Sequence, residues 1–152
     1  MRPAEFQNLL FRSAVMVMSC DGEIADAEVT ELKTIVENEI YFLGYDYAEP
    51  LVSTVVEIKR DGKDAINRYL NDLAGIDLSQ KQKFTLMEVV IRMIEADSIV
   101  QPSEVQFLHL VKSKLKVSEK DLIVKFPKQI GYLISNDLAD LSDSFTQDFK
   151  LK

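Results

Sequence analysis

Residues 20–32 read Cys-Asp-Gly-Glu-Ile-Ala-Asp-Ala-Glu-Val-Thr-Glu-Leu and lie between two apolar stretches of helical spacing. A related pattern returns seventy-six residues further along the chain, with Asp97 in the place of Asp21. In both copies a Glu follows the Asp after seven residues, at Glu28 and Glu104, and a Val and a Leu then follow in the same register. Because the polar pair and the apolar register recur together, the sequence predicts two related helix–loop–helix halves.

The spacing of apolar residues predicts helices over most of the chain. No segment alternates convincingly with the two-residue period of a strand. The stripes expected to face the core are Phe6, Leu10, Ala14 and Val17; Val29, Leu32, Val36, Ile40 and Leu43; Leu51, Val55 and Ile58; Ile66, Tyr69, Leu70 and Leu73; Phe84, Met87, Ile91 and Ile94; and Val105, Leu108, Val111 and Leu115. We therefore expect an all-α fold of about seven helices, packed as two pseudo-symmetric helix–loop–helix halves in one compact bundle.

Gly and Pro residues mark where several of these helices should begin or end. We expect the first helix to end near Cys20, the second at Gly44 and the fourth at Gly75. Pro50 and Pro102 suit the first turns of the third and sixth helices, because the missing proline N–H has no intrahelical partner there.

Two serines should cap helix N-termini. Ser79 and Gln82 have the spacing of a capping box, in which each side chain satisfies a free backbone N–H of the other residue. Ser118 is expected to cap the seventh helix in a similar position. Beyond residue 127 the pattern weakens, and we expect one further helix around residues 133–141.

The composition favours an acidic protein of a single domain, residues 1–152. With 18 Lys and Arg against 25 Asp and Glu, the formal net charge is −7, which argues against nucleic-acid binding and favours basic protein partners or cations. Cys20 is the only cysteine, so no disulfide calls for an oxidising compartment. The apolar run at residues 14–18 is too short for membrane insertion. We therefore expect a cytoplasmic protein.

The run from Asp21 to Glu28 is similar to the second half of a calcium-binding EF-hand loop. The first ligand of such a loop would fall on Val17 in one copy and on Met93 in the other. Neither side chain supplies an oxygen, whereas Ca²⁺ takes six to eight oxygen ligands. The two loops are therefore not EF-hands.

Two readings of the repeated carboxylates remain open. In the first, Asp21 accepts backbone N–H groups of its turn, while Glu28 and Glu104 complement helix N-termini. This reading is favoured, because helix ends demand such partners in any case. In the second, the two loops lie side by side, and Asp21, Glu28, Asp97 and Glu104 together bind a divalent cation, Ca²⁺ or Mg²⁺. The carboxylates nearby would be Glu23, Asp26 and Glu95.

The pattern Cys-Asp-Gly-x-Ile-x-x-x-Glu-x-x-x-Leu at residues 20–32 resembles the signature of TerB-like domains, the tellurite-resistance TerB family. A second block, from residue 78 to residue 118, resembles the same family's next block and follows in the right order. The matching blocks lie within residues 5–124, and residues 125–152 have no counterpart in the resemblance. The sequence departs from the family at Ser98, where Gly is usual.

This resemblance implies an all-helical fold of about seven helices with internal two-fold symmetry. It also implies an acidic surface suspected of binding divalent metal, with Asp21, Glu28, Asp97 and Glu104 at the matching positions. Related domains are fused to other modules, for example in a membrane-anchored DnaJ-like co-chaperone, where they look like interaction modules. A role in protein interaction or stress response follows as an expectation.

The sequence offers little from which to build an enzyme site. His109 is the only histidine and lies between Leu108 and Leu110, so a packing or solvent-edge role is expected. Cys20 precedes Asp21, whose charge raises a thiol pKa, so it is read as a small buried residue rather than a nucleophile. We expect a non-enzymatic interaction module with an acidic surface, and a cation-binding domain is the alternative.

Overall fold

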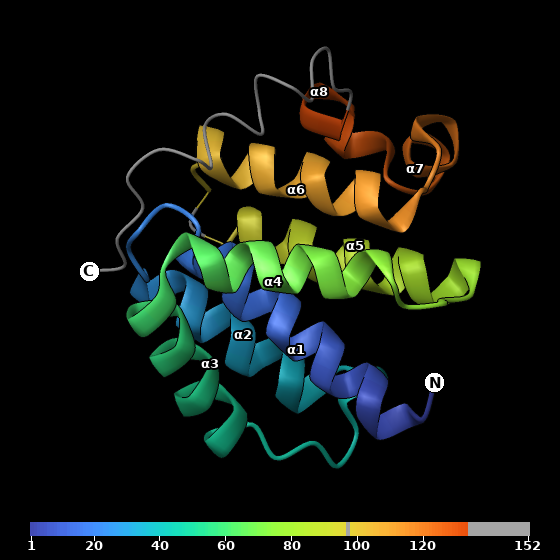
Figure 1. The fold of residues 1–152 in the computed structure, drawn as a ribbon. Coiled ribbons are helices and arrows are strands. Elements are labelled where there is room, and N and C mark those ends of the chain that lie inside the picture. The colour runs from blue at the N-terminus through green and yellow to red at the C-terminus, as the bar shows by residue number, and fades with distance from the viewer. Residues whose placement is uncertain (97, 134–152) are drawn as a thin grey trace.

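The computed structural model describes residues 1–96 and 98–133, and helices make up most of this part of the chain (Figure 1). The elements are α1 (Pro3–Ser19), α2 (Asp26–Asn38), η1 (Ile40–Phe42), α3 (Ala48–Asp61), α4 (Lys63–Ala74), α5 (Gln80–Ile94), α6 (Pro102–Leu115), α7 (Glu119–Lys125), η2 (Pro127–Gln129) and α8 (Ile130–Leu133), where η denotes a 3-10 helix. The described residues contain eight α-helices and no strand. The prediction of an all-α fold of about seven helices is confirmed. None of the described helices is long and apolar enough to cross a membrane.

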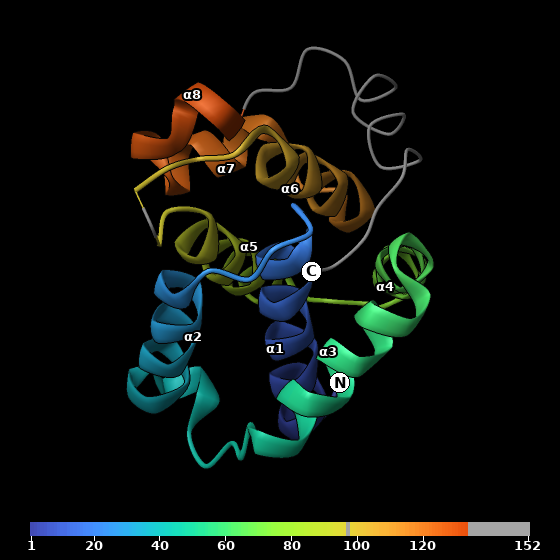
Figure 2. The same ribbon diagram turned by 90° about the vertical axis from the view of Figure 1, so that its left-hand side faces the viewer.

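Helices α1 and α5 pack against each other and form the centre of the molecule. Helix α2 lies against α5, α3 lies against α1 and α4, and α6 lies across α4 and α5. Figures 1 and 2 show α6, α7 and α8 together on one side, with α3 and the connection between α2 and α3 on the opposite side. Each of the two predicted halves, α1–α2 and α5–α6, thus contributes one helix to this central pair.

Helix α1 is buried on almost every side from Leu9 onward, whereas the sequence predicted a single buried face. Leu10, Ala14 and Val17 are buried as expected, and so are Val15 and Met16 between them. A helix that is apolar all round belongs in a core. The central position of α1 explains why its apolar residues exceed the expected stripe.

Helix α2 ends earlier than predicted. The expected stripe continued through Ile40 and Leu43 to Gly44, but α2 ends at Asn38 and a 3-10 turn follows. Ile40 and Leu43 are 82% and 78% exposed, and Phe42 is buried instead. The prediction was wrong here because burial of the large Phe42 ring outweighed the continuation of a helical pattern.

The predicted capping contacts are present. The Ser79 backbone N–H donates to Gln82 Oε1 at 2.9 Å, and the Gln82 N–H donates to Ser79 Oγ at 3.1 Å. Ser118 Oγ accepts from the Asp121 N–H at 3.1 Å. Pro102 is the first residue of α6, as expected. These contacts satisfy donors that a helix N-terminus leaves without intrahelical partners.

A buried lysine holds the last described turns against α6. Lys112 Nζ donates to Glu119 Oε1 at 2.7 Å and to the carbonyl of Leu133 at 2.9 Å. His109, one turn earlier, is also buried, and burial together with the charge of Lys112 lowers its pKa. The further helix expected at residues 133–141 lies, beyond Leu133, outside the described residues.

Candidate functional site

The two repeated loops have matching backbone hydrogen bonds. The N–H of Gly22 donates to the carbonyl of Ser19 at 3.0 Å, and the N–H of Ser98 donates to the carbonyl of Glu95 at 3.2 Å. Gly22 has φ 83° and Ser98 has φ 63°, so both take the left-handed conformation. The second loop therefore keeps the turn although Ser98 replaces the glycine of the first.

Glu28 and Glu104 are the third residues of α2 and α6 and make the same contact. Glu28 Oε1 accepts from the N–H of Ala25 at 3.2 Å, and Glu104 Oε1 accepts from the N–H of Gln101 at 2.9 Å. Both side chains are 4% exposed. Each carboxylate thus satisfies a free amide at the start of its helix, as the capping reading predicts.

Cys20, the residue that follows α1, is affected by side chains from both repeated units. Burial raises the pKa of the Cys20 thiol well above its usual value, and the charges of Glu104, Asp21 and Glu28 raise it further. The Ser103 side chain hydrogen-bonds the thiol and opposes this shift. Carboxylates from both halves therefore affect one buried sulfur. Figure 2 shows the end of the molecule at which α1 connects to α2 and α5 connects to α6. The high pKa agrees with the reading of Cys20 as a buried residue.

Three of the four predicted metal ligands lie in the described part of the chain. The charges of Glu104, Asp21 and Glu28 all raise the pKa of the Cys20 thiol, and Asp21 Oδ1 also accepts the N–H of Glu23 at 3.0 Å. Asp97, the fourth, lies outside the described residues. Within residues 1–96 and 98–133, no group of three or more His, Cys, Asp or Glu residues is arranged to hold a metal ion. The shared cation site stays a prediction.

The carboxylates expected near this site have different surroundings. Glu23 and Asp26 are exposed. Glu95 accepts from Gln129 Nε2 at 3.3 Å and raises the pKa of the Tyr132 hydroxyl, which burial raises first. Glu95 therefore links the second loop to the turns that follow α7.

A second surface was missed by the sequence reasoning. Residues 34–58, which run from the end of α2 through η1 and most of α3, contain no Lys or Arg. They contain five carboxylates, Glu37, Glu39, Asp46, Glu49 and Glu57. Four of their apolar side chains are more than half exposed, Ile40, Leu43, Val52 and Val56. We call residues 34–58 the acidic face. The lack of Lys and Arg in this segment was visible in the sequence.

Two of the acidic face's carboxylates are neutralised by arginines. Glu39 pairs with Arg92 of α5 at 2.6 Å, and Glu57 pairs with Arg68 of α4. Glu37, Asp46 and Glu49 form no ion pair with the residues that the structure describes. The acidic face therefore keeps net negative charge after its internal pairs are counted.

The family of the chain follows from comparison with known proteins. The sequence model of a family described as tellurite resistance protein TerB matches residues 9–125. Neither a curated protein nor a solved structure matched the chain. The match begins within α1, ends with α7 and includes both repeated loops. It covers most of the sequence, and the chain therefore belongs to the tellurite resistance protein TerB family.

Proposed function

We propose that this chain is a non-enzymatic protein-interaction module whose acidic surface binds basic segments of partner proteins. The observation that carries the proposal is the separation of charge along the acidic face: five carboxylates and no Lys or Arg in residues 34–58. Surface potentials of one sign attract partners of the opposite sign and speed their association. The exposed apolar side chains of the same segment supply contact area beside that charge.

Calorimetry with two synthetic peptides tests this function. One peptide has alternating pairs of Leu and Arg, and the other has Glu in place of every Arg, so the two differ only in charge. The chain should bind the Arg peptide and not the Glu peptide, and added salt should weaken binding because it screens exposed charges. If the Arg peptide gives no binding heat at any salt concentration, the proposed function is wrong.

Divalent-cation binding is the second candidate. It is supported by the charges of Glu104, Asp21 and Glu28, which come from both repeated units and all act on the Cys20 thiol. A cation bound only by the native state raises the melting temperature by mass action. Melting curves with Ca²⁺, Mg²⁺ and Mn²⁺ should then show a rise that Asp21→Asn together with Asp97→Asn removes. If metal leaves the melting temperature of the unaltered chain unchanged, the two glutamates serve as helix caps alone.

A further inference from the structure

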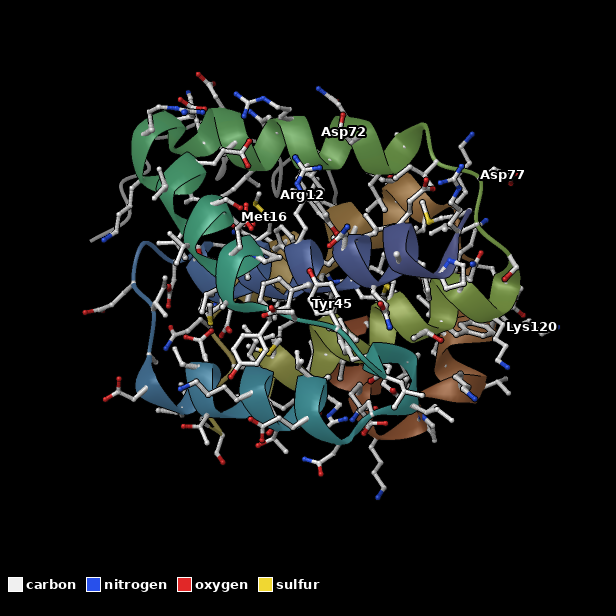
Figure 3. The ribbon with its side chains drawn as sticks, turned by 90° about the horizontal axis from the view of Figure 1, so that it is seen from below. Arg12, Met16, Tyr45, Asp72, Asp77 and Lys120 are labelled. Carbon is white, nitrogen blue, oxygen red and sulfur yellow. The ribbon has the colours of Figure 1, made fainter. Side chains whose placement is uncertain are left out.

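The acidic face is hollowed at two neighbouring places. One groove, of about 470 Å³, lies between α1 and the start of α3 and is lined in part by Phe11, Arg12 and Glu49. The other, of about 400 Å³, runs beside η1 and is lined in part by Ile40. Tyr45 lines both, so the two hollows adjoin at this residue. Figure 3 looks onto this side of the molecule, with Tyr45 near its centre.

The Tyr45 side chain is held in place by its neighbours. The Tyr45 ring packs against Phe11 and Phe42, with centroids 5.4 and 5.5 Å away. Its hydroxyl donates to Asn8 Oδ1 at 2.8 Å. A fixed aromatic face attracts a cation through its quadrupole and loses little side-chain entropy on binding.

The charge available in the α1–α3 groove is negative. Arg12 is the one Lys or Arg among the described residues that line it. Arg12 pairs with Asp72 at 2.9 Å and lies over the Tyr69 ring at 5.4 Å, so neighbours already compensate its charge. Asp46 and Glu49 lie in the same lining. In agreement, burial and then the charge of Asp46 raise the pKa of Tyr45 to about 12. A positive group in this groove would meet two carboxylates and an aromatic ring.

The η1 groove presents aliphatic surface. Ile40 and Leu43 are 82% and 78% exposed although both are large and apolar. The turn that carries them is tied to α1, because Gln7 Nε2 donates to the Leu43 carbonyl at 3.0 Å. Clustered apolar side chains on a turn that a hydrogen bond fixes in place, beside a charged groove, are typical of a protein contact surface.

We propose that the two grooves together dock a basic amphipathic segment of a partner protein. A Lys or Arg side chain of that segment enters the α1–α3 groove, between Tyr45 and the carboxylates of Asp46 and Glu49. An aliphatic side chain of the same segment covers Ile40 and Leu43. This inference rests on the proposed function and adds to it the surface and the chemistry of the partner.

Charge argues against two other occupants of the grooves. Residues 134–152 of this chain contain four Asp and two Lys and would be repelled by the acidic face. A second copy of the chain carries the same net charge of −7. A basic partner segment avoids both repulsions.

Calorimetric titration of the full chain with the Leu/Arg peptide tests the docking surface. The variant Asp46→Asn with Glu49→Gln removes both groove charges, and an Asn at position 46 can still accept the Ala48 N–H that Asp46 accepts at 3.2 Å. The control variant, Asp64→Asn with Asp77→Asn, removes two exposed charges outside the acidic face. The groove variant should weaken binding by about tenfold or more, and the control by about twofold at most, because charges in a binding groove act at shorter range than distant ones.

A second variant, Ile40→Ser with Leu43→Ser, tests the aliphatic contact without altering charge. Both side chains are mostly exposed, so the fold should be retained, and peptide binding should weaken by about fivefold or more. If the unaltered chain binds the peptide and both variants bind like the control, the docking surface is wrong while the proposed function stands. If the unaltered chain does not bind it, both are wrong.

Discussion

Gly22 and Ser98 occupy equivalent positions in the two repeated loops and share a left-handed backbone, with φ of 83° and 63°. Each donates its N–H to the carbonyl three residues earlier. An L-residue with a side chain pays about 1–2 kcal/mol for this conformation, and glycine does not. The second loop therefore keeps the geometry of the first at a conformational cost.

Replacing Ser98 with Gly should stabilise the chain by about 0.5–1 kcal/mol, because relief of the left-handed strain exceeds the added entropy of the unfolded chain. Urea unfolding followed by circular dichroism measures the difference in free energy of unfolding. Gly44→Ala is the matched opposite change, since Gly44 has φ 76° and no atom within 4 Å of an added Cβ. It should destabilise by about 1 kcal/mol. A Ser98→Gly variant less stable than the parent would contradict this account.

Glu28 and Glu104 should contribute more to the free energy of unfolding by accepting hydrogen bonds than by carrying charge. Ala at either position should cost about 1–2 kcal/mol of unfolding free energy, because it leaves a helix-terminal N–H without its acceptor. Gln keeps the side-chain oxygen and should recover at least half of that loss. The measurement is chemical denaturation of the four single variants. Equal losses for Gln and Ala would show that the charge itself is required.

The stability of the chain should fall as the pH drops below about 6.5, the ordinary pKa of histidine. The folded-state pKa of His109 lies below that value, because burial and Lys112 disfavour its charged form, while Glu119 and the Tyr132 backbone oppose the shift. The unfolded chain therefore takes up a proton first, and this favours unfolding. His109→Gln should reduce the loss of unfolding free energy between about pH 7.5 and about pH 5.5.

Because His109 is the only histidine in the sequence, NMR can follow its imidazole signals without assignment ambiguity. A titration midpoint at or above that of a free histidine would refute the predicted direction.

Lys112→Met should destabilise the chain by about 1–3 kcal/mol, because the Leu133 carbonyl loses a buried donor while the apolar stem is kept. Hydrogen exchange of backbone amides in α7 should accelerate, since the contact between Lys112 Nζ and Glu119 is also lost. Lys120→Met is the control, because Lys120 is exposed on α7. The Lys112 contacts would be dispensable if the two variants unfolded at the same urea concentration.

The helices could be predicted from sequence where local rules determine them. Ser79 and Gln82 satisfy each other within one turn, so their spacing suffices to locate the start of α5. The end of α2 could not be found in this way. It depends on Phe42 packing against Tyr45, a contact that the helical spacing of Ile40 and Leu43 does not reveal.

Of the candidate sites, too, one could be predicted from the sequence and the other could not. The equivalence of Glu28 and Glu104 could be seen in the spacing of the repeat, because both residues perform the same local capping. The groove beside Tyr45 was missed, since it exists only when α1 and α3 bring Phe11 and Glu49 into the lining of one groove. Helical spacing describes one helix at a time and does not report which side chains two helices bring together.

The central claim, that the acidic face binds basic partner segments, is tested most directly by NMR. Backbone amide shifts of the labelled chain would be followed during titration with the Leu/Arg peptide. The account predicts saturable shifts concentrated in residues 34–58 and in the turns of α1 around Asn8 and Arg12, with smaller changes elsewhere. Shifts concentrated at the repeated loops, residues 20–28 and 95–104, or no shifts at all, would contradict it.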